Sequence, residues 1–283
     1  MRDDPAAMPD TMRDTVRAAL FAAGDALRGV SDTPRLDAEL LMAHALGISR
    51  DTLILSRLDD PEPDGFAQLL ARRSAQEPTA YITGKRDFWT ITLEVGPGVL
   101  VPRADSETLI EAALDHFGPA GPATILDLGT GPGTLLLAAL DQWPSASGLG
   151  VERSDVARGF ATRNAVRIAP GRAEIREGDW AKGVAARFDL VLCNPPYVES
   201  GALLDAQVGE YEPHEALFAG EDGLDDYRIL AGQLRDVMAP GGIAILEIGA
   251  GQEAAVSALM REQNFAVTCR TDLGGRPRAL ILA

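Results

Sequence analysis

The sequence reads DLGTGPG from Asp127 to Gly133, between the apolar run Thr124–Leu128 and a stretch with helical spacing. Glycine lets a backbone turn sharply and lets a ligand approach the main chain closely. In folds that alternate strands and helices, a turn of this kind lies at the sheet edge where nucleotides bind. The stretch therefore predicts an α/β domain that binds a nucleotide-type cofactor.

Strand and helix patterns continue to alternate after this loop. Helical patterns near Thr134–Gln142, Asp155–Ile168 and Leu224–Met238 separate short apolar runs. Such alternation forms right-handed βαβ units and a parallel sheet. A tight turn at Asp272–Pro277 can only join antiparallel strands. We therefore expect a doubly wound, mostly parallel seven-stranded sheet with an antiparallel C-terminal hairpin. Its strands are expected near Thr124–Leu128, Gly148–Val151, Ala173–Arg176, Phe188–Cys193, Ile243–Ile248, Phe265–Arg270 and Arg278–Leu282.

The sequence before the sheet has a different hydrophobic pattern. Val16, Leu20, Ala23 and Leu27 fall on one helical stripe, and residues 11–80 predict a small all-helical N-terminal domain. Its helices carry no catalytic motif, so we hypothesise that this domain recognises the substrate. Residues 1–10 show no periodicity and are expected to be a disordered tail. The β-branched and aromatic residues of 81–102 predict a hairpin linker, which leaves 103–283 as the cofactor-binding domain.

Composition limits the possible functions. The net charge of −16 argues against a large nucleic-acid footprint, because phosphate binding needs Lys and Arg. No apolar run approaches the ~20 residues that cross a bilayer, and the acidic N-terminus is unlike a signal peptide; a cytoplasmic location without membrane contact is expected. Cys193 and Cys269 lie in apolar runs and are expected to be reduced thiols. His44, His116 and His214 lack metal-ligand spacing, so no metal is expected.

The spacing of the glycine loop distinguishes between cofactors. A dinucleotide fingerprint requires G-x-G-x-x-G, whereas Thr134 stands at the third glycine position here. Glu152 follows the second apolar run, where a carboxylate can accept both hydroxyls of a ribose. After the third run, Asp179 can accept an adenine amino group while Trp180 packs against the ring. The alternatives are a tight turn without ligand, a solvated glutamate and an ordinary half-buried aromatic.

The run FDLVLC leads directly into Asn194-Pro195-Pro196-Tyr197. Successive prolines stiffen the loop and remove N–H groups, which predicts a preformed acceptor site. The Asn194 side-chain oxygen and the Pro195 carbonyl can hold the two N–H groups of a planar amide or amine and direct its nitrogen toward a sulfonium methyl. Tyr197 can stack on the planar group. The alternative is a proline-rich turn that only ends a strand.

These segments resemble the peptide chain release factor glutamine methyltransferases, a class I methyltransferase family. Further similar segments are RLDAELL at 35–41, EPTAYITG at 77–84, Val101-Pro102-Arg103 and Glu212-Pro213. The resemblance implies S-adenosylmethionine as cofactor and the glutamine of the Gly-Gly-Gln motif of release factors as substrate. It implies that the target glutamine contacts Asn194, Pro195, Pro196 and Tyr197. The residues expected at the cofactor are Asp127, Gly129, Thr130, Gly131, Pro132, Gly133, Glu152, Asp179, Trp180 and Asn194.

Two departures from the family pattern stand out. Pro132 replaces a small hydroxyl-type residue, and Ala104-Asp105-Ser106-Glu107 replaces Pro-acid-Thr-Glu. The alternatives of the same class are methylation of a ribosomal-protein glutamine or of adenine. A dinucleotide oxidoreductase and a binding module without activity are alternatives of other classes. We expect release factors as protein partners, no direct nucleic-acid contact and a monomer.

Overall fold

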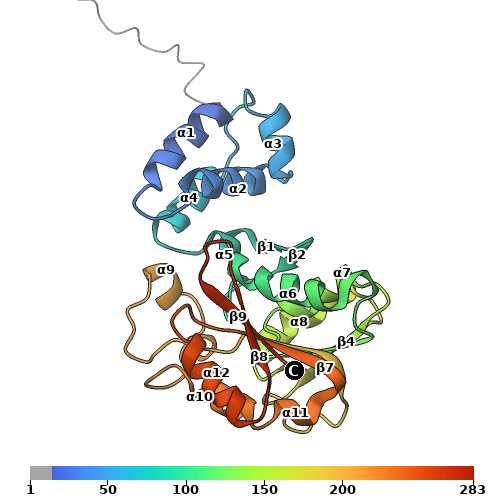
Figure 1. Cartoon of the computed structure of the whole chain (residues 1–283). Coiled ribbons are helices and arrows are strands. Elements are labelled where there is room, and N and C mark those ends of the chain that lie inside the picture. Colours follow the sequence, from blue (N-terminus) through green and yellow to red (C-terminus); the bar gives the residue numbers. More distant parts are fainter. Residues whose placement is uncertain (1–14) are drawn as a thin grey trace, which may run out of the picture. The chain divides into compact units, whose positions relative to one another are not determined.

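The computed structural model describes residues 15–283, which form two compact units (Figure 1). The chain divides after Gly84. We call residues 15–84 the helical unit and residues 85–283 the sheet unit. The expected tail at residues 1–10 lies outside the described part of the chain.

The helical unit is a bundle around one apolar core. Thr15 caps the first helix by accepting a hydrogen bond from the Ala18 N–H, and Gly47 ends the second in the left-handed conformation (φ 65°). Buried side chains such as Leu41 and Phe66 fill the centre. A buried ion pair joins Arg73 Nε to Asp37 Oδ2 at 2.8 Å. The helices are α1 (Val16–Ala26), α2 (Pro34–Leu46), α3 (Arg50–Ser56), α4 (Phe66–Ser74) and α5 (Thr79–Thr83).

The sheet unit confirms the predicted sheet. Its seven strands run in the order β5-β4-β3-β6-β7-β9-β8, parallel except for β9, which is antiparallel to both β7 and β8. The bounds are β3 (Thr124–Leu128), β4 (Ser147–Glu152), β5 (Ala173–Glu177), β6 (Phe188–Cys193), β7 (Met238–Glu247), β8 (Val267–Thr271) and β9 (Pro277–Leu282). The central strands β3 and β6 and the second half of β7 (243–247) are covered on both faces, which explains why their sequences are largely apolar.

Helices cover both faces of this sheet, and a small hairpin precedes it. The hairpin pairs β1 (Lys85–Phe88) with β2 (Ile91–Glu94). The helices are α6 (Glu107–Phe117), α7 (Thr134–Gln142), α8 (Asp155–Ile168), α9 (Ala206–Gly209), α10 (Asp225–Ala231), α11 (Leu234–Val237) and α12 (Glu253–Glu262), with short 3-10 turns η2 (Ala104–Ser106), η3 (Gly118–Ala120) and η4 (His214–Ala216). The α7 helix starts directly after the glycine loop.

The structure differs from the sequence prediction at three places. The helical pattern at Leu224–Met238 is split into α10 and α11, with Gly232 at the break. Gln233, the next residue, accepts a hydrogen bond from the Ala181 N–H through its side chain. The α12 helix, with Val256 buried, was not predicted. Tyr81, which the sequence assigned to the hairpin linker, lies in α5.

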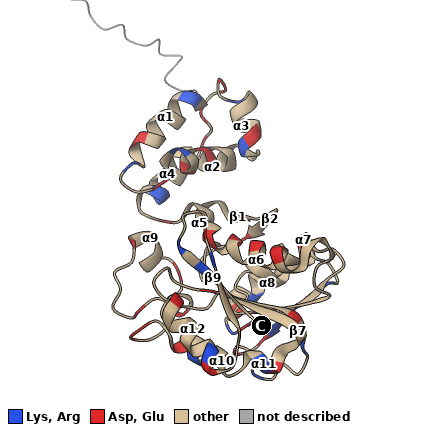
Figure 2. Cartoon of the chain, viewed as in Figure 1, with Lys and Arg blue, Asp and Glu red and all other residues tan. Residues whose placement is uncertain are grey.

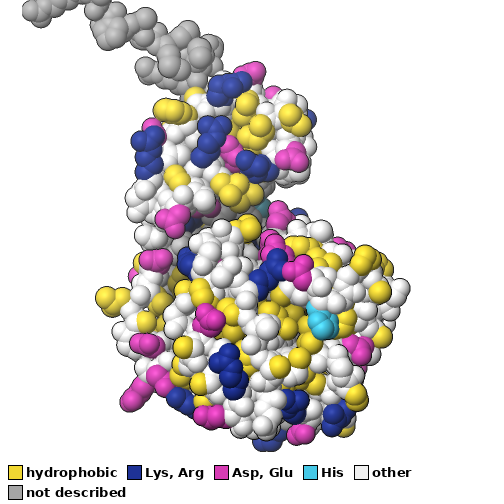
Figure 3. All heavy atoms as spheres, in the orientation of Figure 1, with side chains coloured by type: hydrophobic (Ala, Val, Ile, Leu, Met, Phe, Trp, Pro, Cys, Tyr) yellow, Lys and Arg dark blue, Asp and Glu magenta, His cyan; other side chains and the backbone are white. Residues whose placement is uncertain are grey.

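Charged side chains lie mainly outside the core. In Figure 2 the strands of the large sheet are mostly uncharged, whereas both acidic and basic residues occur on the helices. Figure 3 shows acidic and basic side chains interspersed on the visible face of the sheet unit. Among residues 15–283, no helix is long and apolar enough to cross a membrane.

Candidate active site

The candidate site lies at the carboxyl ends of the parallel strands. Asp127 belongs to the end of β3, Glu152 ends β4, Asn194 follows β6 and Glu247 ends β7. Because β3 pairs with both β4 and β6, and β6 with β7, these four side chains meet at one edge of the sheet. This is the edge where doubly wound sheets bind ligands.

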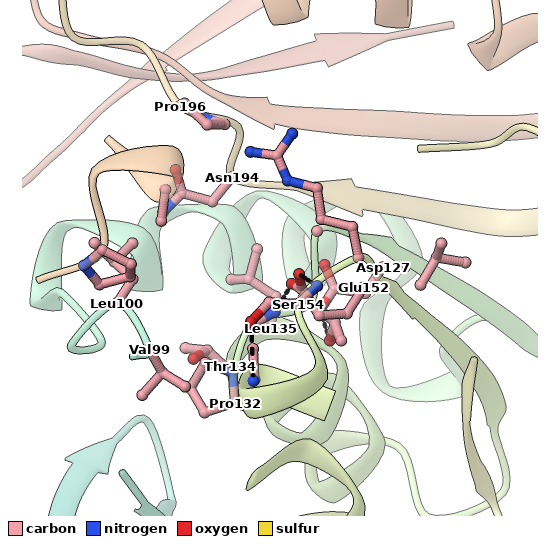
Figure 4. Close-up of a pocket in the computed structure, with 18 of the residues that line it drawn as sticks. Val99, Leu100, Asp127, Pro132, Thr134, Leu135, Glu152, Ser154, Asn194 and Pro196 are labelled. Carbon is pink, nitrogen blue, oxygen red and sulfur yellow. Dashed lines mark hydrogen bonds between the residues drawn. The ribbon is translucent and has the colours of Figure 1, made fainter. Parts of the chain in front are cut away.

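A cavity opens at this edge, and most residues that the sequence singled out line it (Figure 4). Apolar walls are formed by residues such as Val99, Leu100 and Leu135, which the sequence did not single out. Gly133, Pro195 and Tyr197 are not part of the lining. The predicted residues that line the cavity are Asp127, Gly129, Thr130, Gly131, Pro132, Glu152, Asp179, Trp180, Asn194 and Pro196.

The glycine loop adopts a conformation that requires its glycines. Gly129, Gly131 and Gly133 have φ values of 69°, 57° and 93°, which side chains other than glycine rarely tolerate. A Cβ atom on Gly129 would also come within 3.0 Å of the Trp180 ring. Pro132, which departs from the family pattern, needs no N–H here, and its carbonyl accepts a hydrogen bond from Asn164 Nδ2 at 2.9 Å.

Asp127 places a buried oxygen without a partner at this cavity. Its Oδ2 accepts hydrogen bonds from Thr130 Oγ1 (2.6 Å) and the Leu136 N–H (3.1 Å). Within residues 15–283, its Oδ1 is buried and has no hydrogen-bond partner. Burial raises the pKa of Asp127 to about 7, although the hydrogen bond from Thr130 lowers it. A cationic ligand group would satisfy this oxygen and ionise the carboxyl.

Glu152 is held in place by main-chain donors. Its Oε2 accepts from the Gly131 N–H at 2.9 Å, and its Oε1 accepts from the Ser154 N–H at 2.8 Å. Each carboxylate oxygen still has a second lone pair for a ligand hydroxyl. Glu152 therefore fixes the glycine loop and can accept a ribose as well.

Asp179 and Trp180 follow β5 at the same cavity. Asp179 is exposed, whereas Trp180 is half-buried and has a positive φ of 50°. The Trp180 side chain is hydrogen-bonded to Asp226. This bond fixes the indole beside the glycine loop, where a flat ring could pack against it.

We call residues Asn194 to Tyr197, which follow β6, the acceptor loop. Hydrogen bonds to surrounding residues hold this loop in place. Asn194 is half-buried, whereas Pro195 and Pro196 are buried. The Tyr197 hydroxyl donates to Glu247 Oε1 at 3.2 Å, and the Tyr197 carbonyl accepts from Gln252 Nε2 at 3.0 Å. These bonds fix the loop, and stacking of Tyr197 on a substrate stays a prediction.

A second loop is joined to the cavity wall by an ion pair. Arg103 Nη2 lies 2.6 Å from Glu212 Oε1, and Glu212 Oε2 accepts from the Val101 N–H at 3.1 Å. Arg153 Nη2 donates to the Glu215 carbonyl at 2.9 Å. Arg103 and Glu215 both line the cavity, so this Arg103–Glu212 latch connects the walls on either side of it.

Sequence reasoning assigned no role to Ser106, Glu212 or Glu247. Glu247 had the signal that identified Asp127 and Glu152, namely a carboxylate at the end of a buried strand. Ser106 and Glu212 lack such a signal because they reach the site from distant segments. Among residues 15–283, no group of three or more His, Cys, Asp and Glu side chains is arranged to hold a metal ion.

Both units match families of known sequences. Residues 18–84 match the family described as the PrmC N-terminal domain, and residues 105–210 match the methyltransferase small domain. A release factor glutamine methyltransferase of Rhodospirillum rubrum is 41% identical over 257 residues, which cover 88% of this chain and 79% of the relative. One of Cereibacter sphaeroides is 40% identical over 273 residues, which cover 94% of this chain and 95% of the relative.

A solved structure shares the fold at low sequence identity. The catalytic domain of hMettl16, crystallised with an MAT2A 3'UTR hairpin, has a TM-score of 0.55 and 14% identity. The similarity covers 76% of this chain and 81% of that domain. It supports the methyltransferase fold of the sheet unit.

Proposed function

The chain belongs to the release factor glutamine methyltransferase family, and we propose that it methylates the glutamine side-chain amide in the Gly-Gly-Gln motif of a peptide chain release factor. The methyl donor is S-adenosylmethionine. The proposal extends to the residues that bind the cofactor and the glutamine.

The cavity fits S-adenosylmethionine. The unpartnered Oδ1 of Asp127 suits the ammonium of the methionine portion. The free lone pairs of Glu152 suit the ribose hydroxyls, and Trp180 offers a face for the adenine. Gly129 and Gly131 leave room for close approach to the main chain.

The cofactor supplies a methyl group on a positively charged sulfonium. The protein excludes water around this reaction, because Val99, Leu100 and Leu135 form apolar walls. A dry environment favours a transfer in which the charge of the donor disappears. The loop before α6 and the start of α7 therefore contribute to the rate even without a reacting group.

The acceptor loop orients a poor nucleophile. The lone pair of an amide nitrogen is delocalised into the carbonyl, so the nitrogen reacts only when it is held in a productive geometry. We assign the two N–H groups of the target glutamine to the Asn194 side-chain oxygen and the Pro195 carbonyl. Both are acceptors on a loop that is held rigid by Gln252 and Glu247.

The proposal also covers partners. Residues 199–226 contain nine Asp and Glu and no Lys or Arg, which suits a partner surface that is basic because it otherwise faces RNA. We assign recognition of the release factor to the helical unit together with this acidic segment. The protein acts as a cytoplasmic monomer without direct nucleic-acid contact. Raising the salt concentration is expected to raise KM for the release factor.

One observation carries the proposal: Asn194 lines the same cavity as Asp127 and Glu152. The test is to incubate the protein with labelled S-adenosylmethionine and intact bacterial release factors, and to locate the label by peptide mass spectrometry. We expect one methyl group on the glutamine of the Gly-Gly-Gln motif. A release factor with alanine at this glutamine is the control. Absence of label on release factors, with label on ribosomal protein or on adenine in a parallel incubation with ribosomes, would contradict the proposal.

A further inference from the structure

A buried carboxylate lies behind Asn194 and is connected to it through one serine. Glu247 is 1% exposed. Its Oε2 accepts a hydrogen bond of 2.5 Å from Ser106 Oγ, and Ser106 Oγ accepts one of 3.3 Å from Asn194 Nδ2. Because β6 and β7 are paired through Cys193 and Leu246, Glu247 is held directly beside the start of the acceptor loop.

The number of protons on each group fixes which atom donates and which accepts in the hydrogen bonds that link Glu247, Ser106 and Asn194. An ionised carboxylate can only accept, and a serine hydroxyl has a single proton. When Ser106 donates this proton to Glu247, its oxygen is left as an acceptor. The Asn194 amide must then turn its NH2 group toward Ser106, and its Oδ1 is left for the cavity.

We propose that Glu247 and Ser106 are positioning residues that hold the Asn194 oxygen, rather than its NH2 group, toward the target amide. The inference rests on the proposed function, because it takes Asn194 as the acceptor of the glutamine N–H. Neither residue is assigned a contact with the target amide. Glu247 is not part of the cavity lining, and the hydroxyl of Ser106, which lines the cavity, is engaged by Glu247 and Asn194. The two residues decide whether the cavity presents a hydrogen-bond acceptor or a donor.

Protonation of Glu247 reverses the chain of hydrogen bonds. A protonated Glu247 donates to Ser106 Oγ, and the serine proton then points to Asn194. The amide of Asn194 is stabilised in the flipped orientation, with Oδ1 toward Ser106 and NH2 toward the cavity. An NH2 group there repels the N–H groups of the target glutamine.

Several groups around Glu247 set its protonation. Asp105 beside Ser106 and Arg278 on β9 are the charged groups that face it, and Tyr197, Tyr227 and Cys193 are its titratable neighbours. Burial raises the pKa of Glu247 to about 7. The hydrogen bond from Ser106 and the charge of Arg278 act in the opposite direction. The productive ionised form is therefore present above this pKa and is lost as the pH falls through it.

The experiment compares kcat for methylation by four proteins with saturating S-adenosylmethionine and intact release factor, between pH 5.5 and 8.5. They are the wild type, Glu247→Gln, Ser106→Ala and Ser106→Thr. Ser257→Ala is the matched control, because it removes another buried serine hydroxyl, on α12. Cofactor affinity and the melting temperature are measured for each variant.

We expect Glu247→Gln and Ser106→Ala to lower kcat by about 10- to 100-fold, the size of effect expected from misplaced catalytic geometry. Cofactor affinity should stay within about threefold. Ser106→Thr keeps the hydroxyl and should retain most of the activity. The wild-type rate should fall with decreasing pH below about 7, whereas Glu247→Gln should lose this acid limb.

Wild-type kcat in Glu247→Gln or Ser106→Ala would overturn the inference, and so would an acid limb that persists in Glu247→Gln. If Glu247→Gln does not fold, Tyr197→Phe decides the matter. It removes a donor to Glu247, and the acid limb should move to higher pH. An unmoved limb would overturn the inference. A wild type that leaves every release factor unmethylated would contradict the proposed function instead.

Discussion

The ends of β3 and β7 each carry a buried carboxyl group, and the two carboxyl groups differ in their hydrogen bonding. Asp127 and Glu247 are both buried, and burial raises the pKa of each to about 7. Among the described residues, Asp127 leaves Oδ1 without a hydrogen-bond partner, whereas both oxygens of Glu247 accept hydrogen bonds from protein hydroxyls.

The difference separates a ligand-binding carboxylate from a carboxylate that acts within the protein. Leaving a buried polar atom unpaired costs about 1–3 kcal/mol, so the Asp127 oxygen favours a ligand that restores the bond. Glu247 has no unpaired oxygen to restore, because Ser106 and Tyr197 each donate to it, and it is not part of the cavity lining. Under the proposed function, Asp127 at the end of β3 binds the cofactor, and Glu247 at the end of β7 arranges the acceptor loop.

The largest expected effect is on kcat, and it should occur without a matching loss of cofactor affinity. Asn194→Ala should lower kcat by about 10²- to 10³-fold, the loss typical of one preorganised hydrogen-bonding group. Cofactor affinity should stay within a few-fold, since the proposed cofactor contacts are mainly elsewhere. Stopped-flow or quench-flow turnover together with calorimetric titration checks both values. Retained turnover would mean that Asn194 does not hold the target amide.

The reciprocal change is Asp127→Asn. We expect it to weaken cofactor binding by about 10- to 100-fold through loss of a charge-assisted hydrogen bond. At saturating cofactor, kcat should change much less than in Asn194→Ala. Calorimetry measures the affinity, with Glu247→Gln as the matched control that removes a buried carboxylate of similar pKa. If cofactor affinity falls equally in both variants, Asp127 has no special role in cofactor binding relative to Glu247.

Cofactor affinity should also depend on pH. The pKa of Asp127 is about 7 in the free protein, and a bound ammonium would lower it, so binding releases a proton below that pH. We expect binding to be about tenfold weaker at pH 6 than at pH 8, since one pKa unit corresponds to a tenfold change. Calorimetry in buffers of different ionisation enthalpy detects the released proton. If cofactor affinity is the same at pH 6 and pH 8 and binding releases no proton, Asp127 does not bind the cationic group of the cofactor.

The smallest effect concerns stability without cofactor. A raised carboxyl pKa means that the folded protein binds more protons than the unfolded chain between about pH 4 and 7. The Asp127 contribution to stability therefore decreases as the pH rises through this range. At pH 8, Asp127→Asn should raise the melting temperature by about 2–6 °C, and the gain should shrink toward pH 4. Scanning calorimetry at both pH values tests this, and a lowered melting temperature at pH 8 would refute the sign.

Much of this arrangement could be predicted from local sequence. The strand ends were recognised because each is a continuous apolar run followed by a polar residue, as at Asp127, Glu152 and Asn194. The sheet order and its antiparallel end followed from the alternation of elements and from one tight turn. The α12 helix was missed, and its pattern of Val256 and Met260 buried on one face was overlooked in a window between two predicted strands.

The connections across the site could not be predicted in this way. Ser106 and Glu247 are 141 residues apart in sequence, and Arg103 and Glu212 are 109 apart. In neither pair does the local sequence around one residue indicate which distant residue it contacts. Their meeting depends on how the segment before α6 packs at the sheet edge, which is a tertiary property.

The distribution of basic residues around the latch has a practical consequence for proteolysis. Trypsin cleaves after Lys and Arg, and the sequence from Phe188 to Tyr227 contains neither. The acceptor loop and the acidic segment thus leave a tryptic digest as one fragment. A glutamate-specific protease meets exposed sites at Glu210 and Glu215, whereas Glu212 between them is buried against Arg103. Pro213 follows Glu212 and prevents cleavage there, so cuts after Glu210 and Glu215 lie on either side of the latch carboxylate, and their rate reports on how firmly the latch holds this segment.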